Sequence, residues 1–273
     1  MTEAVATGGL GLNAAADKAL KAAAVFWFLA ALIGQWVFVY YISAHYGGTA
    51  VQGDFEAFNK TTIAGHVAGD AVGNFVFAAH VLLAATITFG GTLQLVPQIR
   101  AHAISFHRWN GRLFILTAFA MAIGGLYLVW VRGATTGIFG SVSISLNAAL
   151  IMICAAMTFR YPLARDIDTH RRWALRTFLM VNGVWFLRVG LFAWIILNQG
   201  PVGVGENLDG PFGIFLGFAC FLLPLGVLEL YLRTQDRAGA AGKFAMAGGL
   251  LALTALMGLG IFGAFMFMWR PFL

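Results

Sequence analysis

Charged side chains are scarce in this sequence, where they make up only 10% of the 273 residues and where only eleven residues are acidic. A soluble domain carries about 25% charged residues, so the composition excludes an ordinary soluble protein. The few acids form no paired-carboxylate site, and the chain has no nucleophile triad, Walker loop or dinucleotide fingerprint. Hydrolytic and nucleotide-driven activities therefore rank low, no catalytic residue is predicted, and it stays open whether the protein is an enzyme.

Cysteine is nearly absent as well. The two cysteines, Cys154 and Cys220, both fall inside apolar runs, and their spacing is not that of a metal site. Cysteines in such positions usually behave as small buried hydrophobic residues. They leave the redox compartment undecided.

Apolar residues, in contrast, make up 60% of the chain, and its mean hydropathy is +0.82. A helix needs about 20 apolar residues to cross the hydrocarbon core of a bilayer. Seven segments meet this requirement: 22–44, 71–97, 113–132, 139–160, 175–198, 212–233 and 244–269. The sequence therefore predicts an all-α integral membrane protein with seven transmembrane helices, organised as a single membrane domain over residues 1–273 and partnered by the lipid bilayer.

Positive charges predict the orientation of these helices, because cytoplasmic segments of membrane proteins are enriched in lysine and arginine. With the N-terminus inside, thirteen lysines and arginines fall in cytoplasmic segments and three in outside segments. The prediction is an N-terminus inside and a C-terminus outside, with residues 1–21 cytoplasmic and with outside loops at 45–70 and 199–212. Within the first segment Asn13 is a candidate helix cap. The net charge of +6 reflects this distribution and does not indicate nucleic-acid binding.

One short pattern occurs twice. Arg-Trp-x-x-Arg spans Arg108–Arg112 and Arg172–Arg176, and a histidine precedes each copy, His107 by one residue and His170 by two. Each copy opens the second helix of a pair that is joined by a basic inside loop. Two such hairpins, over about residues 70–195, predict a central four-helix bundle made of the second to fifth helices.

The arginines of each copy are four residues apart and thus share a helix face. Both pairs are expected in the first turns of their helices, where free backbone N–H groups and the helix dipole attract anions. Arg108, Arg112, Arg172 and Arg176 are therefore candidate ligands for phosphate or carboxylate groups. The alternative, left open, is that they anchor the cytoplasmic face to lipid phosphates.

The two histidines are expected at similar depth on equivalent helices. Neutral imidazoles on facing helices can hold a haem iron from both sides, so His107 and His170 are candidate axial ligands of a haem b. The motif arginines would then pair the haem propionates. The alternative, also open, is that both histidines are ordinary polar residues at the membrane interface.

Three polar residues are expected inside the membrane. Arg188 lies twelve residues beyond Arg176, about 18 Å along the helix, and an intramembrane arginine must face the bundle or a cavity. No carboxylate is an obvious partner, because the only acid within a span, Glu229, lies near the inner end of its helix. His80 and Asn147 come at similar depth to Arg188. The three predict either a pocket for a quinone head group or second cofactor, in which His80 is a candidate iron ligand, or a polar network that holds the bundle together.

Taken together, these motifs resemble a bacterial family of multi-pass membrane proteins known only as a domain of unknown function. The resemblance covers about residues 70–195 and rests on His80, His107-Arg108-Trp109-Asn110-Gly111-Arg112, His170-Arg171-Arg172-Trp173 and Arg188. The chain is more distantly similar to di-haem cytochromes of the b561 type, a similarity that implies a haem between His107 and His170. It differs from them where Asn147 stands in place of a histidine partner for His80.

Three functions remain open on these observations. The leading hypothesis is a haem-b or quinone-linked redox protein of the bacterial inner membrane, which would exchange electrons with the quinone pool or a larger membrane complex. A second is a transporter, or an anionic-lipid or substrate-binding protein without a cofactor, in which Arg188 supplies the counter-charge. A third is an accessory subunit that packs onto a larger membrane complex.

Overall fold

The computed structural model describes residues 2–62, 64–134 and 137–273, with side chains described from residue 11 onward. Helices form its framework, and none of these residues forms a strand. In chain order the elements are α1 (Thr2–Tyr41), a π-helical turn (Ile42–Gly47), α2 (Gly48–Val51), a 3-10 helix (Phe55–Lys60), α3 (Ala71–Leu95), α4 (Pro97–His102), α5 (Ile104–Trp130), α6 (Ile138–Leu163), α7 (Ile167–Val181), α8 (Gly183–Leu197), α9 (Pro211–Arg237), α10 (Ala240–Ala264), a second π-helical turn (Phe265–Trp269) and a final 3-10 turn (Arg270–Phe272).

Six of these helices are long and apolar enough to cross a membrane, and α7 and α8 pass the same test as one bent span, which gives up to seven. The seven predicted segments coincide with these spans, so the prediction of an all-α membrane protein is confirmed. The first helix is longer than predicted, because α1 begins at Thr2 and continues through Asn13. Asn13 is therefore an interior helix residue, and the prediction that it caps the helix is wrong. The orientation across the membrane stays a prediction.

Four elements form the central bundle that the repeat predicts. α3 packs against α5, α5 against α6 and α6 against α7, and α3 also contacts α7. The four thus close into a ring in which α5 and α7 stand diagonally opposite each other. One apolar core joins them, with Ile87, Phe114, Ile151 and Phe178 among its buried residues, and α9 adds Phe221 to it.

The fifth predicted span is bent. α7 ends at Val181 and α8 begins at Gly183, and the two axes differ by 58°. Asn182 between them is buried, and its Nδ2 donates to the carbonyl oxygen of Phe178 at 2.7 Å. The glycine that follows is a poor helix former and offers little resistance to a change of direction. As a result α7 stays in the bundle, whereas α8 packs on α10 and α9.

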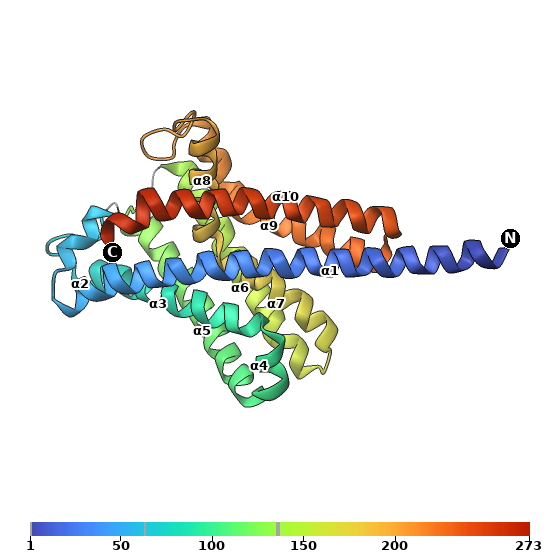
Figure 1. Ribbon diagram of the computed structural model, residues 1–273. Coiled ribbons are helices and arrows are strands. Elements are labelled where there is room, and N and C mark those ends of the chain that lie inside the picture. Colours follow the sequence, from blue (N-terminus) through green and yellow to red (C-terminus); the bar gives the residue numbers. More distant parts are fainter. Residues whose placement is uncertain (1, 63, 135–136) are drawn as a thin grey trace.

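A second core lies where α1, α8 and α10 pack against α3 and the end of α5. α1 and α10 run side by side along much of their length (Figure 1). α8 reaches α10 where a Cβ on Gly260 would collide with the carbonyl oxygen of Val189, so the glycine permits close approach of the two backbones. The core itself is rich in aromatic residues, among them Phe38 of α1, Trp185 of α8 and Trp269 of the C-terminal turn.

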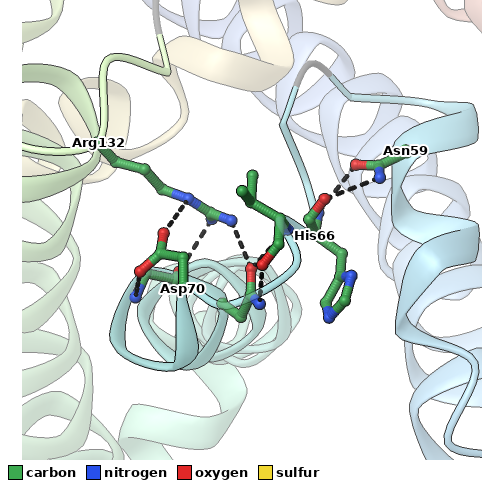
Figure 2. A network of polar contacts seen from close by, with 7 residues as sticks. Asn59, His66, Asp70 and Arg132 are labelled. Carbon is green, nitrogen blue, oxygen red and sulfur yellow. Dashed lines mark hydrogen bonds and ion pairs between the residues drawn. The ribbon is translucent and has the colours of Figure 1, made fainter.

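The segment between α2 and α3 is tied to the end of α5 by polar contacts (Figure 2). The Nε of Arg132 lies 3.0 Å from Oδ2 of Asp70, and its Nη1 donates to the Gly73 carbonyl oxygen at 2.9 Å. Within the segment, Asn59 exchanges two hydrogen bonds with the backbone of His66, at 2.8 and 2.9 Å. The Arg132 side chain is only 4% exposed. The ion pair between Arg132 and Asp70 therefore fixes the segment to one end of the bundle. This is the end where α3 begins and α5 finishes, and we call it the loop end.

Candidate functional site

Both Arg-Trp-x-x-Arg copies lie at the opposite end of the bundle, where α5 and α7 begin, which we call the motif end. Arg108–Arg112 occupies the second and third turns of α5, and Arg172–Arg176 occupies those of α7. The prediction that they lie in the first turns is wrong, because the helices start at Ile104 and Ile167, ahead of the apolar runs that defined the spans. The free N–H groups of each helix start therefore lie about one turn away from the arginines.

Within each copy the tryptophan and the second arginine stack in the same way. The Cζ of Arg112 is 4.7 Å from the ring centre of Trp109, and that of Arg176 is 4.8 Å from the ring centre of Trp173. A spacing of three residues puts both groups on one helix face, where a cation–π contact forms. The repeat in the sequence is thus also a repeat in local structure.

The arginines of the second copy pair with two carboxylates of α9. Arg172 donates to Asp236 through Nη1 and Nη2, at 2.9 and 2.8 Å. Arg176 donates to Glu229 through Nε and Nη2, at 2.6 and 3.0 Å. Two-point contacts of this kind are the strongest that a guanidinium makes with a carboxylate. Arg172 and Arg176 therefore already have anionic partners inside the chain.

The first copy has a different environment. Among the described residues, no carboxylate forms an ion pair with Arg108 or Arg112, and both side chains are exposed. Asn110, in the middle of this copy, packs against α3. Asn110 donates through Nδ2 to the Gly90 carbonyl oxygen of α3 at 2.8 Å, and a Cβ on Gly90 would approach its Oδ1 to 2.9 Å. Asn110 and Gly90 therefore hold α3 and α5 close together.

His170 is held in one orientation by α6. Its Nδ1 lies 2.9 Å from the carbonyl oxygen of Thr158. A ring nitrogen that faces a carbonyl carries the proton, so Nε2 is the nitrogen with the free lone pair. The Thr158 hydroxyl in turn contacts that of Thr177 at 2.8 Å, which joins α6 to α7 at this level. Metal-bound histidines are usually oriented by a hydrogen bond of this kind from the other ring nitrogen.

His107 approaches from the diagonally opposite helix. Its Nδ1 is buried and has no hydrogen-bond partner in the described part of the chain, and its ring is near enough to His170 to interact with it electrostatically. Phe114 and Phe178 both reach the position of Gly91 and fill the bundle there, about 10 to 12 Å further along the helices by helical rise. The two imidazoles therefore both lie at the motif end, nearer the end of the bundle than Phe114 and Phe178.

This arrangement of helices and motifs lies within one region of sequence similarity. Residues 77–204 match the family model described as predicted membrane protein (DUF2306). The DUF2306 region runs from α3 to the loop after α8 and includes both motif copies. It supports the expected resemblance to a multi-pass membrane family, and its description assigns no activity. No curated protein and no solved structure matches the chain.

The DUF2306 region also contains the three intramembrane polar residues, but no described contact joins them. His80 faces α5, because a Cβ on Gly124 would lie 3.6 Å from its Nδ1, and that nitrogen is buried and has no partner among the described residues. Asn147 faces the break between α7 and α8, where a Cβ on Gly183 would lie 3.0 Å from its Nδ2. Arg188 lies against α1 instead. Its ring contact is with Phe38, and no described contact joins it to the other two.

Sequence reasoning missed the groups that fix the motif end. The carbonyl oxygen that orients His170 belongs to the backbone, which carries no residue-type signal. Glu229 and Asp236 carry a weak signal, since acids are rare in this chain. Their partners could not be assigned, because Arg176 and Glu229 are 53 residues apart and meet only when α7 packs on α9.

Proposed function

We propose that this protein is a membrane-embedded electron carrier that binds one haem b between His107 and His170. The observation that carries the proposal is the orientation of His170, whose Nδ1 is engaged by the Thr158 carbonyl and whose Nε2 is left for a metal. His107, on the diagonal helix, adds a second imidazole at the same end of the bundle. A haem bound there would supply reversible one-electron chemistry at its iron.

The donor set at the motif end fits this group. The described residues contain no cluster of three or more histidine, cysteine or acidic side chains that could hold a metal ion, whereas a haem iron needs only two axial imidazoles from the chain. Arg108 and Arg112 would be the partners of the haem propionates, because they have no carboxylate of their own. Arg172 and Arg176 already bond carboxylates of α9, so the proposal assigns the propionates to the first copy.

The charge distribution supports a motif end that faces the cytoplasm of a bacterial inner membrane. Electrons would then be exchanged at this face with the quinone pool or with a larger membrane complex. A quinone site formed by His80, Asn147 and Arg188 is not part of the proposal, because no described contact brings the three together.

A visible absorption spectrum tests the proposal. The protein is expressed with haem supplied, purified in detergent, and measured oxidised and then reduced with dithionite. We expect a Soret band and sharp α and β bands on reduction. A wild-type protein that stays colourless under these conditions would contradict the proposal.

Single histidine substitutions identify the ligands. His107→Ala and His170→Ala should each abolish the low-spin spectrum of the reduced protein. His102→Ala is the matched control, because His102 is exposed at the same end and its Nδ1 also lies near a carbonyl oxygen, that of Gln98, at 3.0 Å. A pigment lost equally in all three variants, or kept in all three, would contradict the assignment.

A further inference from the structure

The charge of Arg188 has no counter-ion among the described residues. The ion pairs of the described chain use other cations, and the Nε of Arg188 is enclosed without a hydrogen-bond partner. Its Nη1 donates to the carbonyl oxygen of Val184 at 3.0 Å, a neutral acceptor in its own helix. An intramembrane guanidinium is costly unless a polar or anionic group faces it.

Aromatic rings line one side of this guanidinium. Its Cζ lies 5.4 Å from the ring centre of Phe38 in α1. Trp269 packs on the same ring, with centres 5.4 Å apart, and its ring centre lies 6.3 Å from that of Tyr41. The charge thus lies beside an apolar wall built by α1 and the C-terminal turn.

Buried hydrogen-bond donors accumulate at the same place. Gln35 precedes Phe38 by one helical turn, and Trp185 precedes Arg188 by one turn and packs on Gly34. Gln35, Trp185 and Trp269 are all 0% exposed. Around Arg188, the buried polar atoms without partners in the described chain are both side-chain amide atoms of Gln35, the hydroxyl oxygen of Tyr41, Nε1 of Trp185, Nε1 of Trp269 and Nε of Arg188.

The unpartnered atoms indicate which kind of ligand could bind here. Four are donors, the Tyr41 hydroxyl can donate or accept, and the Oε1 of Gln35 is an acceptor, so the group that would satisfy them is rich in acceptors. The unbalanced positive charge makes an anionic acceptor the best match, and the aromatic wall suits an apolar body next to it. We infer that the Arg188 cluster, defined as Gln35, Phe38, Tyr41, Trp185, Arg188 and Trp269, binds an organic anion with a small head such as a carboxylate and an apolar body.

The site is separate from the proposed haem site. Tyr46, five residues after Tyr41, contacts Thr61 of the loop segment through its hydroxyl at 2.7 Å, which places the cluster towards the loop end. The histidine pair lies at the motif end. The inference therefore does not depend on haem binding and can fail or succeed on its own.

Anion binding can be measured through thermal stability. The full-length protein in detergent is titrated with benzoate and with octanoate, and with benzyl alcohol and octanol as probes that keep the apolar body and lack the charge. We expect at least one anion to raise the Tm saturably, with the alcohols giving no saturable rise. In Arg188→Gln the midpoint concentration should rise about tenfold or more, since a charge-assisted bond is lost. Arg160→Gln, which removes an exposed arginine at the end of α6, should respond as the wild type does.

Four results would overturn the inference. The first is no response to either anion, which would mean that water satisfies the cluster. The second is an equal response in wild type and Arg188→Gln, and the third is an alcohol as effective as its acid. The fourth is a full response to chloride alone, which would reduce the site to one for inorganic anions.

A second pair of variants covers a failure of Arg188→Gln to fold. Gln35→Leu removes one donor and one acceptor, and Trp185→Phe removes one donor, without touching the charge. Each should weaken anion binding severalfold while the protein still elutes as a single species in detergent. Unchanged binding in both variants would contradict the inference.

Discussion

The two Arg-Trp-x-x-Arg copies have the same local geometry and opposite surroundings. The distance from the arginine Cζ to the tryptophan ring centre is 4.7 Å in the first copy and 4.8 Å in the second. The arginines of the second copy nevertheless each bind a carboxylate of α9, whereas those of the first are exposed and pair with no described acid. A five-residue pattern thus fixes the local conformation, and the neighbouring helix decides what the charges do.

The arginines of the second copy are used within the fold, whereas those of the first copy are free to bind another group. In the second copy the positive charges stabilise the packing of α7 on α9, because each guanidinium donates two hydrogen bonds to a carboxylate of α9. In the first copy the charges remain free for a group outside the chain, such as a haem propionate or a lipid phosphate. Matched substitutions in the two copies should therefore give unequal effects.

The largest difference is expected between Arg176→Gln and Arg112→Gln. The first leaves the carboxylate of Glu229 partly buried without its partner, which should lower the free energy of unfolding by about 3 kcal/mol. The second removes an exposed charge and should change it by less than about 0.5 kcal/mol. Thermal unfolding in detergent measures both.

The double variant Arg176→Gln/Glu229→Gln is the control for this comparison. It removes both charges together, so it should recover most of the stability that the single variants lose. Equal destabilisation by Arg176→Gln and Arg112→Gln would show that the α9 carboxylate is not what distinguishes the two copies.

A smaller difference is expected between the tryptophans. Trp173 is partly buried against the bundle core, whereas Trp109 is 67% exposed. Trp173→Ala should cost about 2 kcal/mol, below the range for a fully buried aromatic residue, and Trp109→Ala less than about 1 kcal/mol. Unfolding midpoints in one detergent provide the measurement, and a larger loss for Trp109→Ala would reverse the comparison.

The two ion pairs within the second copy should also differ. The side chains of Arg172 and Asp236 are 39% and 41% exposed, against 18% and 35% for Arg176 and Glu229. Asp236→Asn should therefore lower the free energy of unfolding less than Glu229→Gln does, and raising the salt concentration should shrink the difference from wild type. A salt-independent cost as large as that of Glu229→Gln would contradict this ranking.

The sequence was a good guide to the spans because long apolar runs depend on composition alone. All seven predicted segments fall on helices of the structure. The break at Asn182 escaped that reasoning, since one polar residue and one glycine barely change the hydropathy of a run. The Asn-Gly pair is itself a recognised break signal, so propensity could have indicated the bend where hydropathy did not.

Which polar residues meet was harder to predict than where each one lies along its helix. Helical rise predicts the depth of Arg188, but its neighbours depend on the rotation and direction of α8. The bend turned that helix towards α10, and Arg188 consequently faces Phe38 of α1. The grouping of Arg188 with His80 and Asn147 assumed a straight helix inside the bundle.

The smallest predicted difference concerns the starts of the two motif helices. α7 is capped by Asp166, whose Oδ1 accepts from the Thr169 N–H at 3.0 Å, whereas α5 follows Ala103 and has no side-chain cap. Ala103→Asp should therefore stabilise the protein by up to about 1 kcal/mol, and Asp166→Ala should lower its Tm slightly.

The cap on α7 also predicts a pH dependence that α5 should lack. The hydrogen bond from the Thr169 backbone holds the pKa of Asp166 below its usual range. A lowered folded-state pKa means that the contribution of Asp166 is complete above the usual aspartate pKa and is lost as the pH falls through the lowered value. The Tm difference between wild type and Asp166→Ala should thus be constant from neutral pH down to about pH 5 and should vanish in stronger acid. In Ala103→Asp the first copy should gain the same acid-sensitive contribution. A difference that instead grows on acidification would mean that the carboxylate of Asp166 does not act as the cap.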